Sequence, residues 1–237
     1  MKEEASNLHI INTVNSTQGD IDIYSVTPEQ RKPSLLLHAC CGPCSTSCVE
    51  RLCRDYSITV YYYNPNITDR EEYYLRRDTL LAFLKAFNEE HKDTCFVDYL
   101  EGEYEPDKYL AKCSPLKDEP EGGRRCDVCF ALRLAETARK AGQLGIDYFT
   151  TTMSVSPHKN YDKIKTLGLS LEEMTSSRFL DIDFKKKNGF GRSVELSKKY
   201  GLYRQNFCGC EFARYAAKAA SDKRDNKRDN ERKREHE

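Results

Sequence analysis

Short apolar runs alternate with longer amphipathic stretches through residues 34–168 of this 237-residue chain. Four runs are rich in apolar, β-branched or aromatic side chains and predict buried strands at 35–39, 58–63, 94–99 and 148–151. Five stretches carry apolar residues at helical spacing and predict helices at 45–54, 71–88, 104–112, 129–143 and 161–168. Because strands alternate with helices, the pattern favours a Rossmann-like α/β fold with a parallel, doubly wound sheet and right-handed crossovers.

The two ends of the chain have different patterns. Residues 1–33 are polar and weakly periodic and predict an N-terminal extension, either partly disordered or with a short helix. After residue 183, a Lys-Lys-Lys-Asn-Gly turn and a helix at 193–200 predict a helical C-terminal part. Residues 221–237 alternate basic and acidic side chains and predict a disordered tail or a helical extension. We therefore expect a single α/β catalytic domain over 34–220.

The composition limits the classes of partner. The chain has 38 basic and 38 acidic side chains, so a polyanionic partner must be held by a local basic patch and not by net charge. No stretch has the pattern of a signal peptide or of a membrane-spanning helix, which predicts a cytoplasmic protein without a membrane partner. Eleven cysteines in a reducing compartment favour metal binding or redox catalysis over a framework of structural disulfides.

Seven of the cysteines form three groups, at Cys40-Cys41-x-x-Cys44, Cys126-x-x-Cys129 and Cys208-x-Cys210. The first group directly follows a predicted strand, and open α/β sheets bind their ligands at the ends of parallel strands. A C-x-x-C spacing lets two thiolates reach one metal centre. The long separation of Cys44 from Cys126 exceeds that of compact zinc ribbons, so we expect a site assembled from distant strand ends.

The residues alone leave three chemistries open. Five to seven thiolates exceed the four ligands of structural zinc, which favours an iron–sulfur cluster with room for a second metal beside it. Structural zinc is the second possibility. The third is a thioredoxin-like thiol–disulfide site, although Cys40 stands where an aromatic residue usually precedes that motif and the chain has no Trp. The remaining thiols that we considered are predicted to be structural: Cys48, Cys53, Cys95 and Cys113.

Seven segments together are more specific than any one of them. They are 35–45 with the first cysteine group, Tyr63-Asn-Pro-Asn-Ile67, Glu72-Tyr-x-x-Arg76, and the segments 125–134, 149–160, 183–192 and 204–210. In this order they resemble the QueH-type epoxyqueuosine reductases over nearly the whole core. The resemblance implies a fold related to the nucleotide-binding PP-loop/HUP group. It also implies reduction of epoxyqueuosine to queuosine at the wobble position of tRNA anticodons, the final step of queuosine biosynthesis.

The resemblance further implies a [4Fe-4S] cluster and an adjacent mononuclear iron. It assigns the metal ligands, as a set, to Cys40, Cys41, Cys44, Cys126 and Cys129, with the cluster itself on Cys40, Cys41, Cys126 and Cys129. We expect Cys208 and Cys210 to be further ligands or a redox-active pair near the substrate, because a C-x-C disulfide is strained and labile; simple structural thiols are the alternative. The expected partners are tRNA carrying epoxyqueuosine, bound through its anticodon loop, and an unidentified electron donor.

The substrate-binding candidates lie in the matched segments. They come from the second strand end, two helices, a hydroxyl-rich loop and a basic run: Asn64, Asn66, Arg76, Arg133, Thr151, Thr152, Ser154, Ser156, Lys159, Lys186 and Arg192. His158 is a candidate proton donor, and His38 is expected to orient the cysteine loop. Phe184, Phe190 and Tyr203 lie near the basic run, where they would suit base stacking.

Two other functions stay open at this point. One is a PP-loop-like tRNA-modifying enzyme that adenylates its substrate, although cysteines occupy the place of its phosphate loop. The other is a zinc-stabilised RNA-binding module, which metal analysis would distinguish from an iron-dependent reductase.

Overall fold

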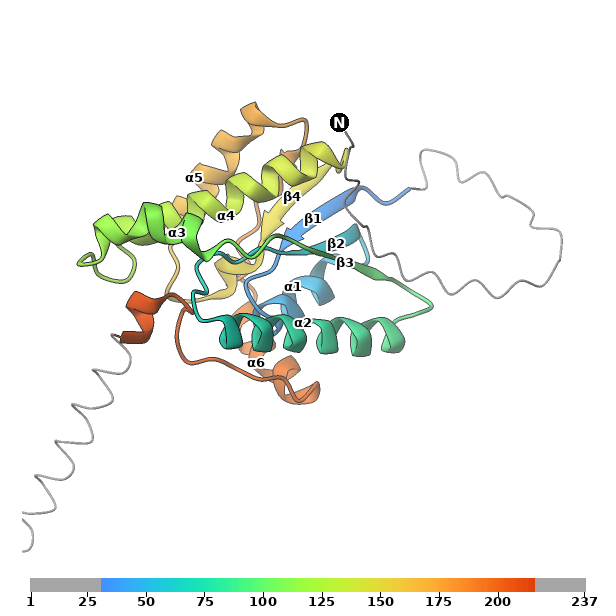
Figure 1. The fold of residues 1–237 in the computed structure, drawn as a ribbon. Coiled ribbons are helices and arrows are strands. Elements are labelled where there is room, and N and C mark those ends of the chain that lie inside the picture. The colour runs from blue at the N-terminus through green and yellow to red at the C-terminus, as the bar shows by residue number, and fades with distance from the viewer. Residues whose placement is uncertain (1–30, 216–237) are drawn as a thin grey trace, which may run out of the picture. The chain divides into compact units, whose positions relative to one another are not determined.

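The computed structural model describes residues 31–215, and within them a sheet of five parallel strands forms the centre of the fold (Figure 1). The strands lie in the order β3-β2-β1-β4-β5. Their bounds are Ser34–His38 for β1, Ser57–Tyr62 for β2, Val97–Glu101 for β3, Tyr148–Thr151 for β4 and Arg178–Phe179 for β5. All four strand pairs are parallel, which confirms the predicted Rossmann-like α/β class. A relation to the PP-loop group stays a prediction.

Helices cover both faces of this sheet. The helices are α1 (Gly42–Leu52), α2 (Arg70–Glu90), α3 (Pro106–Cys113), α4 (Arg124–Gln143), α5 (Tyr161–Leu171) and α6 (Gly189–Lys199), with short 3-10 turns η2 (Ser114–Leu116), η3 (Thr152–Val155) and η4 (Glu172–Met174). Figure 1 shows α1, α2 and α6 on one face and α4 and α5 on the other. In β1, Leu35 and Leu37 pack on the face that α1 and α2 cover, and Leu36 packs on the face that α4 and α5 cover, because side chains alternate along a strand.

The strand order places the ligand-binding edge of the sheet. The chain runs outward from β1 to β2 and β3, and then returns to the other side of β1 to form β4 and β5. The order therefore reverses between β1 and β4, and ligands bind in such folds beyond the carboxyl ends of the strands at this reversal. The segments that follow His38 and Thr151 lie at this edge.

Several element bounds differ from the sequence prediction. Helix α1 begins at Gly42 instead of residue 45, because Cys41 is its N-cap and Pro43 is well tolerated in a first turn. Helix α4 begins at Arg124 and not at Cys129, so the Cys126-x-x-Cys129 pair lies on the helix. The third strand occupies 97–101 and the last helix 189–199. Strand β5 was not predicted, because two residues are too few to show a periodic pattern.

Parts of the predicted domain organisation lie outside the described residues. These are residues 1–30 of the expected N-terminal extension and the whole of the charged tail at 221–237. The boundaries of the single domain at 34–220 stay a prediction. Within residues 31–215, no helix combines the length and the apolar character needed to cross a bilayer.

Candidate active site

The first cysteine group lies at the carboxyl end of the central strand. Cys40 is in the loop after β1, Cys41 caps α1, and Cys44 is in the first turn of that helix. The three sulfur atoms lie within 4.8 Å of one another, and the Cys40 and Cys41 sulfurs are 3.9 Å apart. Three thiols at this spacing can bind one metal ion. The hydroxyl of Thr152, after β4, accepts from the Cys40 amide at 3.2 Å and donates to the Cys40 sulfur at 3.4 Å.

A buried histidine, at the end of β1, forms hydrogen bonds next to this cysteine loop. His38 Nε2 lies 3.0 Å from the carbonyl oxygen of Tyr63, and Nδ1 lies 2.9 Å from the hydroxyl oxygen of Thr151. Burial lowers the pKa of His38 to about 3, so the ring is neutral. Since a carbonyl only accepts, Nε2 carries the hydrogen and Nδ1 accepts from Thr151. His38 thus links the ends of β1, β2 and β4, in agreement with the orienting role that the sequence predicts.

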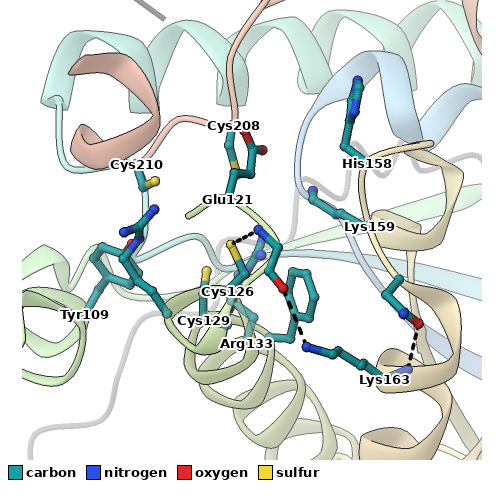
Figure 2. Close-up of a pocket in the computed structure, with 14 residues that line it drawn as sticks. Tyr109, Glu121, Cys126, Cys129, Arg133, His158, Lys159, Lys163, Cys208 and Cys210 are labelled. Carbon is teal, nitrogen blue, oxygen red and sulfur yellow. Dashed lines mark hydrogen bonds between the residues drawn. The ribbon is translucent and has the colours of Figure 1, made fainter. Parts of the chain in front are cut away.

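The two other cysteine groups line one small cavity, which we call the inner cavity (Figure 2). Cys126 and Cys129 enter it from one face of α4, because residues three apart on a helix are neighbours. Cys208 and Cys210 enter it on the opposite side, from residues 203–210, which we call the C-terminal segment (Figure 2). The volume is about 60 Å³. The fold therefore brings together two thiol pairs that are far apart in the sequence.

A second and larger space adjoins the inner cavity, and we call it the outer cleft. Its volume is about 530 Å³, and its lining includes Cys40 and Cys44. Both spaces are lined by Cys208 and Lys159, together with Glu121 and His158. Cys40 and Cys44 of the first cysteine group thus lie on the outer cleft and the other two groups on the inner cavity, with Cys208 at the junction.

Two cations face these thiols. Arg133 is 1% exposed, donates from Nε to the Cys129 carbonyl oxygen at 3.3 Å, and has an Nη2 atom without a hydrogen-bond partner. The Lys159 side chain makes no hydrogen bond or ion pair with any residue in 31–215. A buried cation is costly unless a negative charge compensates it. The thiols that face Arg133, among them Cys129 and Cys208, can provide that charge as thiolates.

The environment favours deprotonation at two of the thiols. Cys41 and Cys44 hydrogen-bond to Cys40 and hold the pKa of Cys40 well below its usual range, and Lys159 acts in the same direction. Cys210 likewise holds the pKa of Cys208 well below its usual range, with help from Lys159. Thiolate, and not thiol, is the form of cysteine that binds metals. Burial raises the pKa values of Cys126 and Cys129, so it is the soft sulfur donors themselves that fit an iron–sulfur centre, with the buried Arg133 and the partly buried Lys159 as positive counter-charge.

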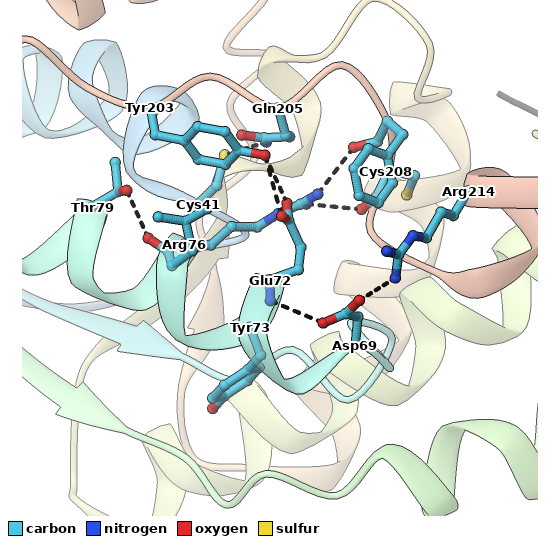
Figure 3. A network of polar contacts seen from close by, with 12 residues as sticks. Cys41, Asp69, Glu72, Tyr73, Arg76, Thr79, Tyr203, Gln205, Cys208 and Arg214 are labelled. Atoms are coloured by element: carbon cyan, nitrogen blue, oxygen red, sulfur yellow. Dashed lines mark hydrogen bonds and ion pairs between the residues drawn. The ribbon is translucent and has the colours of Figure 1, made fainter. Parts of the chain in front are cut away.

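Arg76 fixes the C-terminal segment against helix α2 (Figure 3). Its guanidinium forms an ion pair of 2.6 Å with Glu72 and donates to the carbonyl oxygens of Phe207 at 3.3 Å and Cys208 at 3.1 Å. Gly209 has a φ of +100°, and a Cβ there would lie 2.8 Å from Arg76 Nη1. Only glycine suits this position between the two cysteines, because L-residues rarely adopt that backbone conformation.

Gln205, in the same segment, contacts the first cysteine group directly. Its Nε2 donates to the Cys41 sulfur at 3.0 Å, and its Oε1 is buried without a hydrogen-bond partner. The side chain also lines the outer cleft. The C-terminal segment therefore contributes Cys208 and Cys210 to the inner cavity and a hydrogen-bond donor to Cys41.

Known proteins that are similar to this chain belong to one family. A family model described as "Epoxyqueuosine reductase QueH" matches residues 35–216. The chain belongs to the QueH family. A relative with the same name from Streptococcus pyogenes serotype M1 is 44% identical over 185 residues, which cover 78% of this chain and 72% of the relative. A further relative so named, from Thermotoga maritima, is 33% identical over 183 residues, which cover 76% and 90% of the two chains.

The residues that were suggested for substrate binding divide into three sets, two in the core and one on the surface. Those that line the outer cleft or the inner cavity are Arg76, Arg133, Ser156 and Lys159. The others in the core support the loops: Asn64 donates to the Ala39 carbonyl oxygen at 2.8 Å, Ser154 accepts from the Phe184 amide at 3.3 Å, and Asn66, Thr151 and Thr152 are buried. Substrate binding by any of the three sets stays a proposal.

Two predicted basic residues lie on the surface outside both spaces. Arg192 is exposed on α6 and pairs with Glu50 at 2.7 Å and Glu195 at 2.9 Å. Lys186 is exposed before that helix and makes no ion pair with a residue in the described range. The structure therefore does not bring these two side chains to the thiols.

Some site residues were not predicted. Gln205 and Arg204 lie in a matched segment, which was the only signal for them, and Tyr109 and Glu121 lie outside all of the motifs. Cys113 was predicted to be structural, and it packs fully buried beside Cys129 and Cys210. Cys48 is also buried, with its thiol 3.4 Å from the Cys44 carbonyl oxygen, as expected of a structural thiol.

Proposed function

We propose that this chain reduces epoxyqueuosine in tRNA to queuosine, the last step of queuosine biosynthesis. The membership in the QueH family supports this function, since its relatives are named epoxyqueuosine reductases. The observation that carries the chemistry is the meeting of six thiols on two adjoining spaces, with Cys41 buried beside Cys40 and Cys44 and with two cations nearby. A redox reaction on a substrate bound in the outer cleft explains this arrangement best.

Conversion of an epoxide to an alkene removes one oxygen atom as water and consumes two electrons and two protons. We assign the ligands of a [4Fe-4S] cluster to Cys40, Cys41, Cys126 and Cys129, and those of an adjacent iron to the same set together with Cys44. When bound, these groups supply single electrons and a Lewis acid for the epoxide oxygen. The soft sulfur donors and the unpartnered Nη2 of Arg133 support this assignment.

The side chains of the protein then have distinct tasks. Lys159 faces both spaces and can hold a proton at Nζ for the departing oxygen, and the exposed His158 can exchange protons with solvent. Cys208 and Cys210 are either further ligands or a dithiol that closes to a disulfide. That closure releases two electrons and two protons, which equals the demand of one epoxide. An external electron donor would then reduce the disulfide.

The substrate enters from the outer cleft, which solvent reaches. The cleft is lined by Lys159 and Arg204, which pair with no carboxylate in residues 31–215, and by Arg76, whose charge Glu72 compensates. Glu121 is the acidic residue among its lining residues. This excess of positive charge favours a polyanion such as the anticodon loop. We place the reaction in the cytoplasm, where tRNA is available.

Metal and sulfide analysis of anaerobically purified protein tests the proposal. We expect iron and acid-labile sulfide in the wild type, and loss of both the iron–sulfur absorbance and the reductase activity in Cys126→Ser and Cys129→Ser. Cys95→Ser is the matched control, because Cys95 lies before β3 at the opposite edge of the sheet. Full turnover by colourless, iron-free protein would contradict the mechanism, and zinc alone would favour the RNA-binding module.

A further inference from the structure

An exposed aromatic side chain lies on the outer cleft. Phe190, in the first turn of α6, is 41% exposed and lines the cleft together with Cys40, Cys44 and Cys208. The two other aromatics that the sequence suggested for stacking are less suitable. Phe184 is 2% exposed in the core, and the Tyr203 hydroxyl is engaged with Glu72 at 3.2 Å, so Phe190 is the one of these three rings that lines the cleft. Phe207 also lines the cleft, but it is only partly exposed and lies against the Arg76 guanidinium.

The backbone holds Phe190 in this place. Lys187 and Asn188 directly before α6 both have left-handed φ angles, of 59° and 56°. A Cβ on Gly189 would lie 1.8 Å from the Phe184 carbonyl oxygen, so the turn packs without space for any other residue there. Non-glycine residues with positive φ cost free energy and are concentrated at functional sites. The turn thus fixes the position of the Phe190 ring, although hydrophobic burial stabilises this exposed ring only slightly.

A guanidinium lies against the same ring. The Arg204 Cζ atom is 5.6 Å from the centre of the Phe190 ring. Arg204 Nη1 donates to the Ser197 hydroxyl at 3.2 Å and to the Ser193 carbonyl oxygen at 3.4 Å, and no carboxylate in residues 31–215 pairs with it. The pair therefore combines a flat apolar surface with an uncompensated positive charge.

The surroundings extend this positive charge. Lys185 donates to the Lys159 carbonyl oxygen at 2.8 Å. This hydrogen bond joins the basic run Lys185–Lys187 to the loop after β4, whose residues His158 and Lys159 line both spaces. Lys186 and Lys187 are exposed and make no ion pair with a residue of the described part. An aromatic ring beside several free cations suits a ligand that has both flat bases and phosphates, which is single-stranded nucleic acid.

We propose that Phe190 and Arg204 form a stacking platform for an unstacked nucleobase of the anticodon loop, next to the nucleotide whose modified base enters the outer cleft. This inference rests on the proposed function and adds the surface that binds a base of the substrate tRNA. Stacking of one base on an aromatic side chain corresponds to about 5- to 150-fold in affinity. Phe190→Ala should therefore raise the KM for tRNA and the Kd for anticodon stem-loop RNA by a factor in this range, with the loss on KM rather than kcat.

The experiment measures KM and kcat on tRNA that carries epoxyqueuosine, and the Kd of a labelled anticodon stem-loop, with anaerobic holoenzyme. Phe190→Tyr should restore most of the affinity, because it keeps the ring. Arg204→Gln should weaken binding without changing the turn before α6. Phe96→Ala is the control, since Phe96 is 64% exposed before β3 at the opposite edge of the sheet.

The outcomes separate this inference from the proposed function. If the wild type reduces its substrate and Phe190→Ala has unchanged KM and Kd, the platform is wrong and the function stands. Equal losses in Phe190→Ala and Phe190→Tyr would also overturn the platform. If the wild type is inactive on epoxyqueuosine but Phe190→Ala still weakens RNA binding selectively, the platform stands and the proposed reaction is wrong.

Discussion

Replacement of Arg76 by methionine tests how the C-terminal segment reaches the site. Arg76 is 2% exposed, and it joins Glu72 on its own helix to the carbonyl oxygens of Phe207 and Cys208 (Figure 3). Methionine keeps much of the apolar volume and removes every one of these polar contacts. We expect the segment that carries Cys208 to loosen from α2.

The contacts set the size of the effect. Breaking a buried ion pair costs about 3–5 kcal/mol, because the remaining charge has no partner. Here the Tyr203 hydroxyl still donates to Glu72, which reduces the cost, while the two hydrogen bonds from the charged guanidinium to carbonyls add to it. We expect a loss of about 3 kcal/mol in the free energy of unfolding. With a urea m value of about 2 kcal/mol/M, the midpoint falls by about 1.5 M.

The assay compares urea unfolding and hydrogen–deuterium exchange of Arg76→Met with those of Arg77→Met. Arg77 is the next residue on α2, and its ion pairs with Asp78 and Glu101 are solvent-exposed, so its replacement should cost under about 1 kcal/mol. In Arg76→Met, the amides of 203–210 should exchange at least about tenfold faster. The double variant with Glu72→Gln should recover part of the loss, since no unpaired carboxylate remains. Equal midpoints and equal exchange in the two single variants would refute the positioning role of Arg76.

Three further variants test other contacts of the site. Gln205→Leu removes the N–H group that donates to the Cys41 sulfur, so we expect a lower kcat and a more negative midpoint potential of the metal centre in a redox titration; unchanged values would contradict this role. Arg133→Met removes the buried counter-charge, and we expect less iron per chain than in the control Arg139→Met, whose guanidinium is exposed; equal iron contents would count against it. Gly189→Ala forces a Cβ against a backbone carbonyl oxygen at 1.8 Å, and should lower the unfolding free energy by about 2 kcal/mol in urea; wild-type stability would show that the turn relaxes.

The sequence was sufficient to predict four of the five strands and one part of the site. The apolar run at 35–39 is typical of a strand buried on both faces, and such a strand belongs in the middle of a parallel sheet. Cysteines directly after it therefore had to lie at the ligand-binding edge, where the structure places Cys40, Cys41 and Cys44. The pair Cys126 and Cys129 was expected to share a site with them; it lies on the inner cavity, and the helix that presents it begins earlier than expected. A metal centre held by all five thiols stays a proposal.

The contribution of the C-terminal segment could not be predicted, because contacts between distant side chains determine it. The spacing of Glu72 and Arg76 indicates an ion pair along a helix, but no local pattern shows that the guanidinium also binds two carbonyls of residues 207 and 208. Residues 202–207 belong to no helix or strand. Side-chain contacts must therefore hold the segment, which is why Arg76, suggested from the sequence as a substrate residue, acts in the structure on the backbone beside Cys208.

The contacts of the C-terminal segment also connect the inner cavity with the outer cleft. Cys208 faces both the inner cavity and the outer cleft, while Gln205 in the same segment donates to Cys41. Loosening this segment would separate Cys208 from the inner cavity and remove the donor from Cys41 in a single step. Variants of Arg76 should therefore disturb Cys208 and Cys41 together, whereas Gln205→Leu should disturb Cys41 alone. A disturbance of only one of these two cysteines in Arg76→Met would show that the two spaces are held independently.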